Sequence, residues 1–480
     1  MNKAITQHNK FYVTTSIPYV NDKPHIGHLL EFIQADVLAR YHRSVGDDTF
    51  LLTGTDEHGQ KIFEAARDAK ADVKRFAAKN SELFLEMARI VDMSNDYFVR
   101  TTDERHKKAA QKIWKACASD IYKGLYSGLY CTGCEQYYTS REAINGQCPI
   151  HKVKLKELDM ESYFFALSKY QDQIIELIEL NALRIVPEKR RNEMLQFAKS
   201  GLEDVSISRP KSQLNWGVEV PNDPEHVMYV WFDALTNYIS AVGYVDNNEM
   251  YNKFWPADVH VIGKDIARFH CLLWPAMLIS SGQRTPKSVY VHPFIDSGGH
   301  KMSKSLGNVI DPIESMKKFG VDPLRYFLMR HIPFDNDGDF TNERFVEKYN
   351  SDLANNLGNL VARTATMINK YCKGKYITVK TNPISGLEDD MANCAFNKYL
   401  DKIFDRLDIL NASIEENKPW ELYKSDIHKT EEFLSSLASE IIAIAQVLKP
   451  FMPETAKKII KTFSSSKVDS KVGILFPRID

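Results

Sequence analysis

Pro24-His25-Ile26-Gly27-His28 lies between a predicted strand and a predicted helix. The strand is Phe11-Tyr12-Val13-Thr14-Thr15-Ser16, an apolar and β-branched run typical of a buried strand. The helix follows from the spacing of Leu30, Ile33 and Val37, and it ends near Gly46. A strand that turns into a helix presents backbone N–H groups and the positive end of the helix dipole, which suits phosphate.

The residues of this loop fit that interpretation. Gly27 allows a ligand to approach the backbone closely, and His25 and His28 can donate hydrogen bonds to phosphate oxygens. The alternative is a helix start with two incidental histidines, because short motifs match by chance.

A second stretch, Gly298-Gly299-His300-Lys301-Met302-Ser303-Lys304-Ser305, lies far downstream. Its two glycines predict a mobile loop, and its lysines and serines supply charge and hydroxyls for a polyphosphate. The alternative is a solvated basic turn.

Composition limits the class of protein. Hydrophobic residues make up 44% of the 480 residues and charged residues 26%, as in ordinary globular domains, and the length allows two to four of them. No apolar run is long enough to span a bilayer, and the first residues lack the apolar core of a signal peptide. The net charge of −1 does not by itself indicate a nucleic-acid partner. The seven cysteines are too few for a disulfide framework, so we expect a reducing compartment.

The order of elements predicts a split parallel sheet. Residues 11 to about 115 read as strand, helix, strand, helix, with helices over 65–91 and 104–118. Strands are also predicted at 229–234, 259–262 and 288–291, after an insertion of about a hundred residues that includes a helix near 168–182. The two loops described above then belong to two halves of one Rossmann-like α/β domain.

Asp56 follows the second strand, Thr49–Gly54, where ligands of an open α/β sheet collect. A carboxylate there can hold an amine. On the residues alone, a helix N-cap is the more common role for such an aspartate.

A zinc site is predicted from two cysteine-containing pairs. Cys131 and Cys134 are followed, after thirteen residues, by Cys148 and His151. The four side chains make a complete tetrahedral set, so the metal is expected to be structural, with one ion per chain. We interpret Cys117, Cys271, Cys372 and Cys394 as buried small apolar residues.

After Asp339 the sequence predicts helices at 342–370, 390–414, 428–448 and 453–464. These form either a stabilising bundle or an RNA-reading bundle. In the second case Asn359, Arg363 and Trp420 have the chemistry to bond and stack on unpaired bases.

The two loops together resemble the HIGH and KMSKS signatures of class I aminoacyl-tRNA synthetases. From about residue 11 to 460 the chain is similar to methionyl-tRNA synthetases, in Ser16–Asn21, Thr53–Gly59, the single zinc knuckle and Gly263–Asp265 with Phe269-His270 and Trp274. One departure is Leu235, where some members carry proline.

The resemblance implies four domain segments and a set of site residues. Residues 1–120 and 229–340 would be the halves of the catalytic domain, 121–228 the zinc-binding connective insertion and 341–480 the helical anticodon-binding domain.

The catalytic groups would be His25, His28, Lys301 and Lys304. ATP would contact these four with Gly27, Gly263, Asp265 and Ser303. Methionine would be held by Asp56 at its amine and by Ile17, Tyr19, Trp231, Ala234, Tyr238, Ile266, Phe269 and His270 around its side chain. The anticodon would be read by Asn359, Arg363 and Trp420.

The implied reaction joins L-methionine to tRNA(Met) through a methionyl-adenylate. ATP is the second substrate, and Mg²⁺ is the cofactor that binds with it. We expect aromatic walls to contact the methionine sulfur, together with the Tyr19 hydroxyl and a nitrogen of His270. No large editing domain fits between residues 115 and 230, which argues against leucyl, isoleucyl and valyl enzymes.

Two alternatives remain. A cysteinyl-tRNA synthetase would need an open zinc position, and a non-catalytic tRNA-binding relative would be expected to lose some of the four catalytic groups. The chain ends soon after the helices with no appended tRNA-binding domain, so we expect a monomer, located in the cytoplasm and without a membrane partner.

Overall fold

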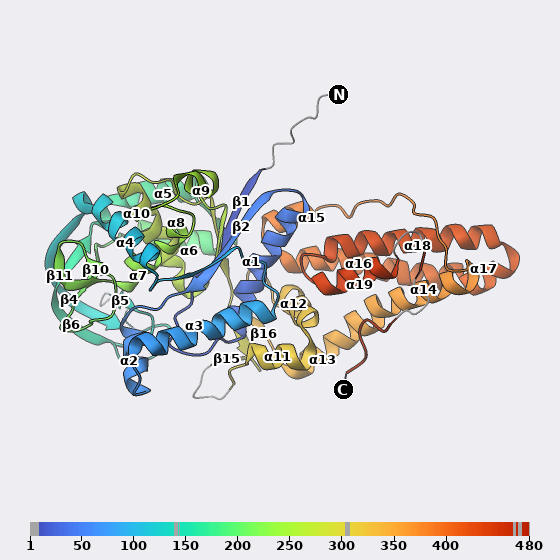
Figure 1. The fold of residues 1–480 in the computed structure, drawn as a ribbon, viewed down its shortest axis with the longest axis horizontal. Helices are drawn as coiled ribbons and strands as arrows, with labels where there is room; N and C mark the ends of the chain where they lie inside the picture. Colours follow the sequence, from blue (N-terminus) through green and yellow to red (C-terminus); the bar gives the residue numbers. More distant parts are fainter. Residues whose placement is uncertain are drawn as a thin grey trace, which may run out of the picture. The chain divides into compact units, whose positions relative to one another are not determined.

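The computed structural model describes residues 9–138, 143, 145–302, 308–463, 467–468 and 473–479. The chain divides into two compact units, Met1–His292 and Pro293–Asp480 (Figure 1). Among the described helices, none has the length and apolar character that a bilayer crossing requires.

The first unit is built on a six-stranded sheet in which every neighbouring pair is parallel. Its order is β3 (Tyr97–Arg100), β2 (Asp48–Thr55), β1 (Lys10–Thr14), β12 (Val259–Gly263), β13 (Ser288–His292) and β7 (Arg184–Val186). The predicted parallel α/β sheet is confirmed. The strand order reverses between β1 and β12, so the loops that follow these two strands diverge and leave a crevice at their carboxyl ends.

Helices flank this sheet: α1 (Ile26–Ser44), α2 (Gln60–Asp68), α3 (Val73–Ile90), α4 (Glu104–Ala116), α5 (Gln171–Glu179), α6 (Glu188–Lys199), α9 (Asn248–Phe254) and α10 (Trp274–Ser280). The single helix predicted over 65–91 is wrong. Lys70 adopts a left-handed backbone conformation with φ 52°, which ends α2, and the Asp72 side chain then caps α3 by accepting from Arg75 N.

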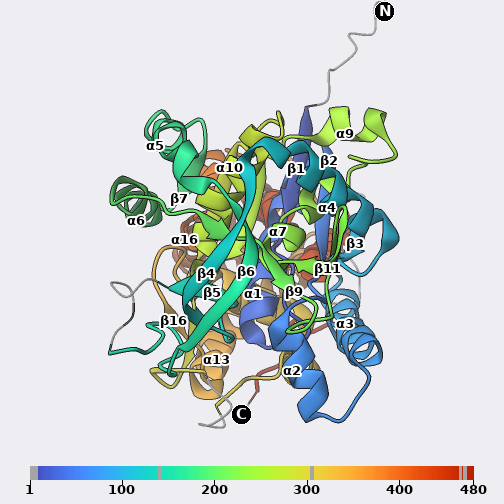
Figure 2. The ribbon, with the colours of Figure 1, turned by 90° about the vertical axis from the view of Figure 1, so that its left-hand side faces the viewer.

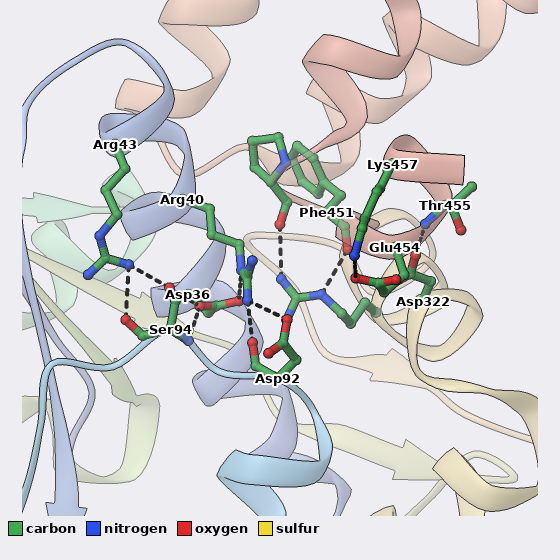
Figure 3. Close-up of polar contacts among 12 residues, drawn as sticks. Asp36, Arg40, Arg43, Asp92, Ser94, Asp322, Phe451, Glu454, Thr455 and Lys457 are labelled. Carbon is green, nitrogen blue, oxygen red and sulfur yellow. Dashed lines mark hydrogen bonds and ion pairs between the residues drawn. The ribbon is translucent and has the colours of Figure 1, made fainter. Parts of the chain in front are cut away.

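A buried carboxylate fixes α1 in place. Asp36 accepts the guanidinium of Arg40 at 2.7 Å and the Ser94 backbone N–H at 2.7 Å (Figure 3). Arg43, one turn further along, donates to the Ser94 carbonyl oxygen at 2.9 Å. The helix that follows the histidine loop is therefore tied to the segment between α3 and β3.

The zinc-knuckle segment forms a separate antiparallel sheet with the order β5 (Gln136–Tyr138), β4 (Ile121–Cys131), β6 (Lys156–Phe165) and β8 (Val205–Ser206). Strands β4 and β6 pair along their whole length, as the long ribbon in Figure 2 shows. A smaller antiparallel sheet follows, of β10 (Glu219–Val220), β11 (Asp223–Met228) and β9 (Ser208–Pro210). Strand β7 lies within residues 121–228 but joins the central sheet, at its edge.

The strand predicted at 229–234 is wrong, because this segment forms the short helix α7 (Val230–Ala234), followed by α8 (Asn237–Ser240). All residues of both helices are buried. A short helix that is buried on every side shows no 3.6-residue pattern, so a short and mostly apolar run does not distinguish it from a buried strand.

The second unit begins with short strands β14 (Ile295–Ser297), β15 (His300–Lys301) and β16 (Gly338–Asp339) and continues as helices. These are α11 (Pro312–Phe319), α12 (Val321–Arg330), α13 (Asn342–Lys348), a π-helix (Tyr349–Gly358), α14 (Asn359–Tyr371), α15 (Leu387–Ala392), α16 (Phe396–Asn417), α17 (Pro419–Ser425), α18 (Ile427–Leu448) and α19 (Pro453–Thr462). Helices α14, α16 and α18 run side by side (Figure 1).

The predicted helical tail is confirmed, with two changes. The helix predicted over 342–370 contains the π-helical stretch, and the one predicted over 390–414 starts later, at Phe396. Within this unit Asp322 of α12 accepts the Thr455 backbone N–H at 2.6 Å and joins α12 to α19 (Figure 3).

Candidate functional site

The histidine loop caps α1 with its own side chains. The Gly27 backbone N–H donates to Nδ1 of His25 at 3.1 Å, and the His25 backbone N–H donates to Nδ1 of His28 at 3.2 Å. A backbone N–H only donates, so both Nδ1 atoms are acceptors and each neutral ring carries its proton on Nε2. The two rings stack with centroids 3.7 Å apart. The loop therefore holds two Nε2–H donors side by side.

Both imidazoles are held neutral. Burial lowers the pKa of His25 to about 4 and lowers the pKa of His28 well below its ordinary value. The N–H groups of Gly27 and His28 are used inside the loop, by His25 Nδ1 and by the His25 carbonyl oxygen. The expectation of free backbone N–H groups is wrong for these two residues, whereas the Nε2–H groups of the two imidazoles remain available as donors to an anion.

Asp56 lies at the end of β2 and is 2% exposed. It is not the N-cap of the next helix, because that position belongs to Gly59. Its carboxylate receives the His58 backbone N–H at 3.3 Å and the Thr101 hydroxyl at 3.4 Å, and no described cation pairs with it. Burial, and then the charge of Asp233, raise the pKa of this carboxyl well above its usual range.

A pocket opens beside Asp56. Its lining residues come from the loop after β1, the end of β2, α7, α8 and the π-helix Phe269–Leu273: Ser16, Ile17, Asp56, Trp231, Ala234, Leu235, Asn237, Tyr238 and His270. Aromatic side chains with one buried carboxylate among them suit a small ligand that carries an apolar part and a cationic group.

His270 has both ring nitrogens occupied. Its Nδ1 contacts the Ile266 carbonyl oxygen at 3.0 Å, and its Nε2 contacts the Tyr238 hydroxyl at 2.7 Å. A carbonyl oxygen only accepts, so Nδ1 is the protonated nitrogen and the Tyr238 hydroxyl donates to Nε2. Burial lowers the pKa of His270 to about 4. The expected contact between a His270 nitrogen and a sulfur is therefore not available in this arrangement.

Three predicted residues support the pocket without lining it. Phe269 stacks on Trp231 with ring centroids 3.9 Å apart, and Tyr19 meets the same indole edge-on at 6.0 Å. Ile266 contributes the carbonyl oxygen that orients His270. The buried Tyr19 hydroxyl has no hydrogen-bond partner among the described residues, so it is a free donor.

Sequence reasoning missed Ser16 and Asn237 as lining residues and noted Leu235 only as a departure. It also missed Asp233, whose buried carboxylate receives His58 at 2.6 Å and His106 at 2.7 Å. Those two contacts hold the pKa of Asp233 at about 2, against the effect of its burial. Asp233 joins α7, which carries Trp231 and Ala234, to the loop of Asp56. The signal in the sequence was a charged residue inside an otherwise apolar segment.

The four predicted zinc ligands converge. Their ligand atoms all lie within 4.8 Å of one another, with Cys134 Sγ at 3.4 Å from Cys148 Sγ and at 3.1 Å from His151 Nδ1. Gly133 lies against this cluster, because a Cβ at this position would lie 3.1 Å from the His151 ring and the ring would have to shift. Three thiols and one imidazole fit a closed tetrahedral zinc site. The other four cysteines are buried, as predicted.

The predicted nucleotide residues of the first unit lie at the end of β12. Gly263 ends that strand, and a Cβ on it would lie 2.8 Å from the Asp265 carboxylate. A larger residue at position 263 would require the Asp265 side chain to shift.

In the second unit, Lys301 is exposed on β15, with Nζ 5.1 Å from the Phe294 ring centroid. Gly298 and Gly299, with φ 63° and 74°, form the two-residue turn between β14 and β15. Ser303 and Lys304 lie outside the described residues.

The predicted anticodon residues lie on the helical bundle. Asn359 and Arg363 are four residues apart on one face of α14, and Arg363 donates to Glu415 of α16 at 2.7 Å. Trp420 is partly exposed on α17, shortly after the end of α16. The Arg363–Glu415 pair joins this face of α14 to the C-terminal end of α16, and Trp420 follows that end in the chain.

Comparison with known proteins gives concordant results. The family model "tRNA synthetases class I (M)" matches residues 11–160 and 154–365. The methionine–tRNA ligase of Caldanaerobacter subterraneus subsp. tengcongensis is 42% identical to this chain, and the match covers 98% of this chain and 79% of the relative. The methionine–tRNA ligase of Rhizobium meliloti is 43% identical, and the match covers 94% of this chain and 91% of the relative. The structure of Mycobacterium tuberculosis methionyl-tRNA synthetase in complex with methionyl-adenylate superposes with a TM-score of 0.93 at 36% identity, covering 98% of this chain and all of that one.

The parallel sheet with its reversal point, the histidine loop and the matched family model define a class I tRNA synthetase. Within this class the chain belongs to the methionyl-tRNA synthetase family. Its activity is the activation of methionine and the charging of tRNA, and the cysteinyl-specific alternative is not favoured.

Proposed function

We propose that methionine binds in the pocket of the first unit with its ammonium group on Asp56. The observation that carries this assignment is the buried Asp56 carboxylate, which lines the pocket and has no cationic partner among the described residues. The aromatic rings of Trp231 and Tyr238 then surround the thioether, with sulfur–aromatic contacts of about 0.3–1.5 kcal/mol. The Tyr19 ring meets Trp231 edge-on, and the unpaired Tyr19 hydroxyl is the donor that we assign to the sulfur.

The activation step transfers the adenylyl group of ATP. A carboxylate oxygen of methionine forms a bond to the α-phosphorus, the bond from that phosphorus to the bridging oxygen breaks, and pyrophosphate leaves with the electron pair. In the second step the ribose hydroxyl of the terminal tRNA adenosine, assigned as the 2′-hydroxyl, attacks the methionyl carbonyl and releases AMP. Catalysis then depends on positioning and on stabilising negative charge.

His25 and His28 stabilise that charge as neutral donors. Each presents Nε2–H while Nδ1 is fixed by a backbone N–H, so the donors are pre-oriented before ATP binds. We assign Gly27, Gly263 and Asp265 to the nucleotide and Lys301, Ser303 and Lys304 to its phosphates. These assignments follow the family motifs.

We propose that the enzyme uses two metal ions. Zn²⁺ bound by Cys131, Cys134, Cys148 and His151 would stabilise the knuckle of β4 and β5, and the complete set of four protein ligands favours a structural role. Mg²⁺ would accompany ATP and neutralise phosphate charge.

We further propose that Asn359, Arg363 and Trp420 read the CAU anticodon. The four functional segments of the chain are then residues 1–120, 121–228, 229–340 and 341–480. We also propose that the enzyme is a cytoplasmic monomer. The free cysteines are consistent with a reducing compartment. Light scattering of the purified chain tests the monomer.

The test of the central proposal is ATP–pyrophosphate exchange with each amino acid in turn. Exchange with methionine alone supports the assigned pocket. Exchange with cysteine would move the zinc into the active site, and no exchange with any amino acid would leave only a tRNA-binding role.

A further inference from the structure

Lys61 is the second residue of α2, and its side chain lies among the groups assigned to both substrates. The ammonium Nζ is 5.0 Å from the ring centroid of Tyr19, beside the methionine pocket. It is also close enough to His25 and His28 that its charge helps to lower the pKa of both imidazoles. One cation thus lies beside Tyr19 at the amino-acid pocket and within electrostatic range of the histidine loop.

This ammonium has no hydrogen bond or ion pair with any described side chain. Glu135, the carboxylate whose charge acts most on this ammonium, is already engaged, because it accepts the Lys61 backbone N–H at 2.5 Å and the Tyr130 hydroxyl. Burial lowers the pKa of the Lys61 ammonium, and the negative charges of Glu135 and Asp265 act against that decrease. A half-buried lysine without a partner carries a desolvation cost that a bound anion would offset.

The position also fits the charge of the reaction. The methionine carboxylate and the α-phosphate of ATP are both anionic and must meet between the pocket and the histidine loop. The two imidazoles of that loop are neutral, so they donate hydrogen bonds but do not cancel charge. A lysine ammonium near both groups would reduce the repulsion between the two anions, and its interaction would strengthen as negative charge spreads in the transition state.

We propose that the Lys61 ammonium binds the oxyanions of the reacting pair, the methionine carboxylate and the α-phosphate, and is a catalytic residue of adenylate formation. This inference rests on the proposed function, since it takes the methionine pocket and the histidine loop as assigned above. The covalent step is unchanged: the carboxylate oxygen bonds to the α-phosphorus, pyrophosphate leaves, and Lys61 neither gains nor loses a proton.

The test uses Lys61→Met in the full-length chain, with Lys74→Met as the matched control. Lys74 is exposed on the neighbouring helix α3. Loss of one preorganised donor typically lowers kcat about 10²–10³-fold, and we expect such a loss of methionine-dependent exchange in Lys61→Met only. Lys61→Gln, which keeps a polar group at this half-buried position, is expected to show the same loss if Lys61→Met fails to fold.

Methioninol separates the two oxyanions because it lacks the carboxylate. If Lys61→Met weakens binding of methionine but not of methioninol, the ammonium contacts the carboxylate. If both bind normally while KM for ATP rises or kcat falls, it contacts the α-phosphate. Normal exchange in Lys61→Met would overturn the inference while leaving the proposed function intact, whereas absence of methionine-dependent exchange in the unmodified enzyme would overturn both.

Discussion

The hydroxyl of Tyr238 donates a hydrogen bond of 2.7 Å to Nε2 of His270, on the wall of the methionine pocket. The Ile266 carbonyl oxygen fixes the other nitrogen, so the ring has one defined tautomer and orientation. The pocket wall is therefore held in shape before methionine binds.

Tyr238→Phe should increase KM for methionine. The change leaves the buried Nε2 of His270 unpaired, which costs about 1–3 kcal/mol. If the ring turns away to avoid this cost, KM for methionine should rise roughly 5- to 150-fold. Steady-state exchange kinetics measure this effect. Tyr244→Phe is the control, because Tyr244 is buried outside the pocket and its hydroxyl forms no bond within the described part of the chain. An equal rise of KM in both variants would contradict the positioning role.

Methionine binding should weaken as the pH falls. The Asp56 pKa is raised by burial, so in the free enzyme the carboxyl becomes protonated at a higher pH than an exposed aspartate. A protonated carboxyl does not pair with the methionine ammonium, so KM for methionine rises as pH falls through that raised pKa. Asp56→Asn should raise KM for methionine by about a hundredfold or more, because breaking a buried charge pair has an effect on this scale. In this variant KM for methionine should not depend on pH over this range. A parallel pH dependence in the variant would assign the effect to another group.

Turnover should not require a charged imidazole. With the pKa of His25 at about 4 and that of His28 lower than usual, both rings are neutral at pH 6–8. At saturating methionine and ATP, kcat for exchange should therefore not decline across pH 6–8 through imidazole deprotonation. His28→Ala removes one Nε2–H donor, and we expect kcat to fall about 10²–10³-fold. A rate that decreases as pH rises through 6.5 would indicate imidazolium catalysis instead.

Trp420→Ala should impair charging of tRNA and spare exchange. Stacking of a base on an aromatic ring contributes about 1–3 kcal/mol, so kcat/KM for tRNA should fall roughly 5- to 150-fold. Ile409→Ala, at a residue of α16 that is 57% exposed, is the control on the same bundle. Equal losses in exchange and charging would show that Trp420 acts on stability.

Metal analysis should find one zinc ion per chain. Cys148→Ser should reduce this content and make the β4–β5 knuckle more sensitive to protease, because the metal joins its two halves. Cys372→Ser serves as the control, since Cys372 is buried in the second unit and lies outside the cluster. Full zinc content in Cys148→Ser would remove this residue from the ligand set.

The sequence by itself determined the features that depend on short-range order. Strand β1, helix α1, the zinc ligand spacing and the helical tail follow from hydrophobic periodicity and motif spacing. These signals are local, because the spacing of side chains along a helix, strand or knuckle directly decides which of them meet.

Only the tertiary structure decided the rest. It showed that 230–234 is a helix and that Asp56 is a buried pocket wall rather than a cap. It fixed the tautomers of His25, His28 and His270 through contacts with backbone atoms, and it brought Asp233 to His58 and Lys61 to Tyr19. Burial and hydrogen-bond partners depend on which distant segments pack together, and these set the charge and the donors of each side chain.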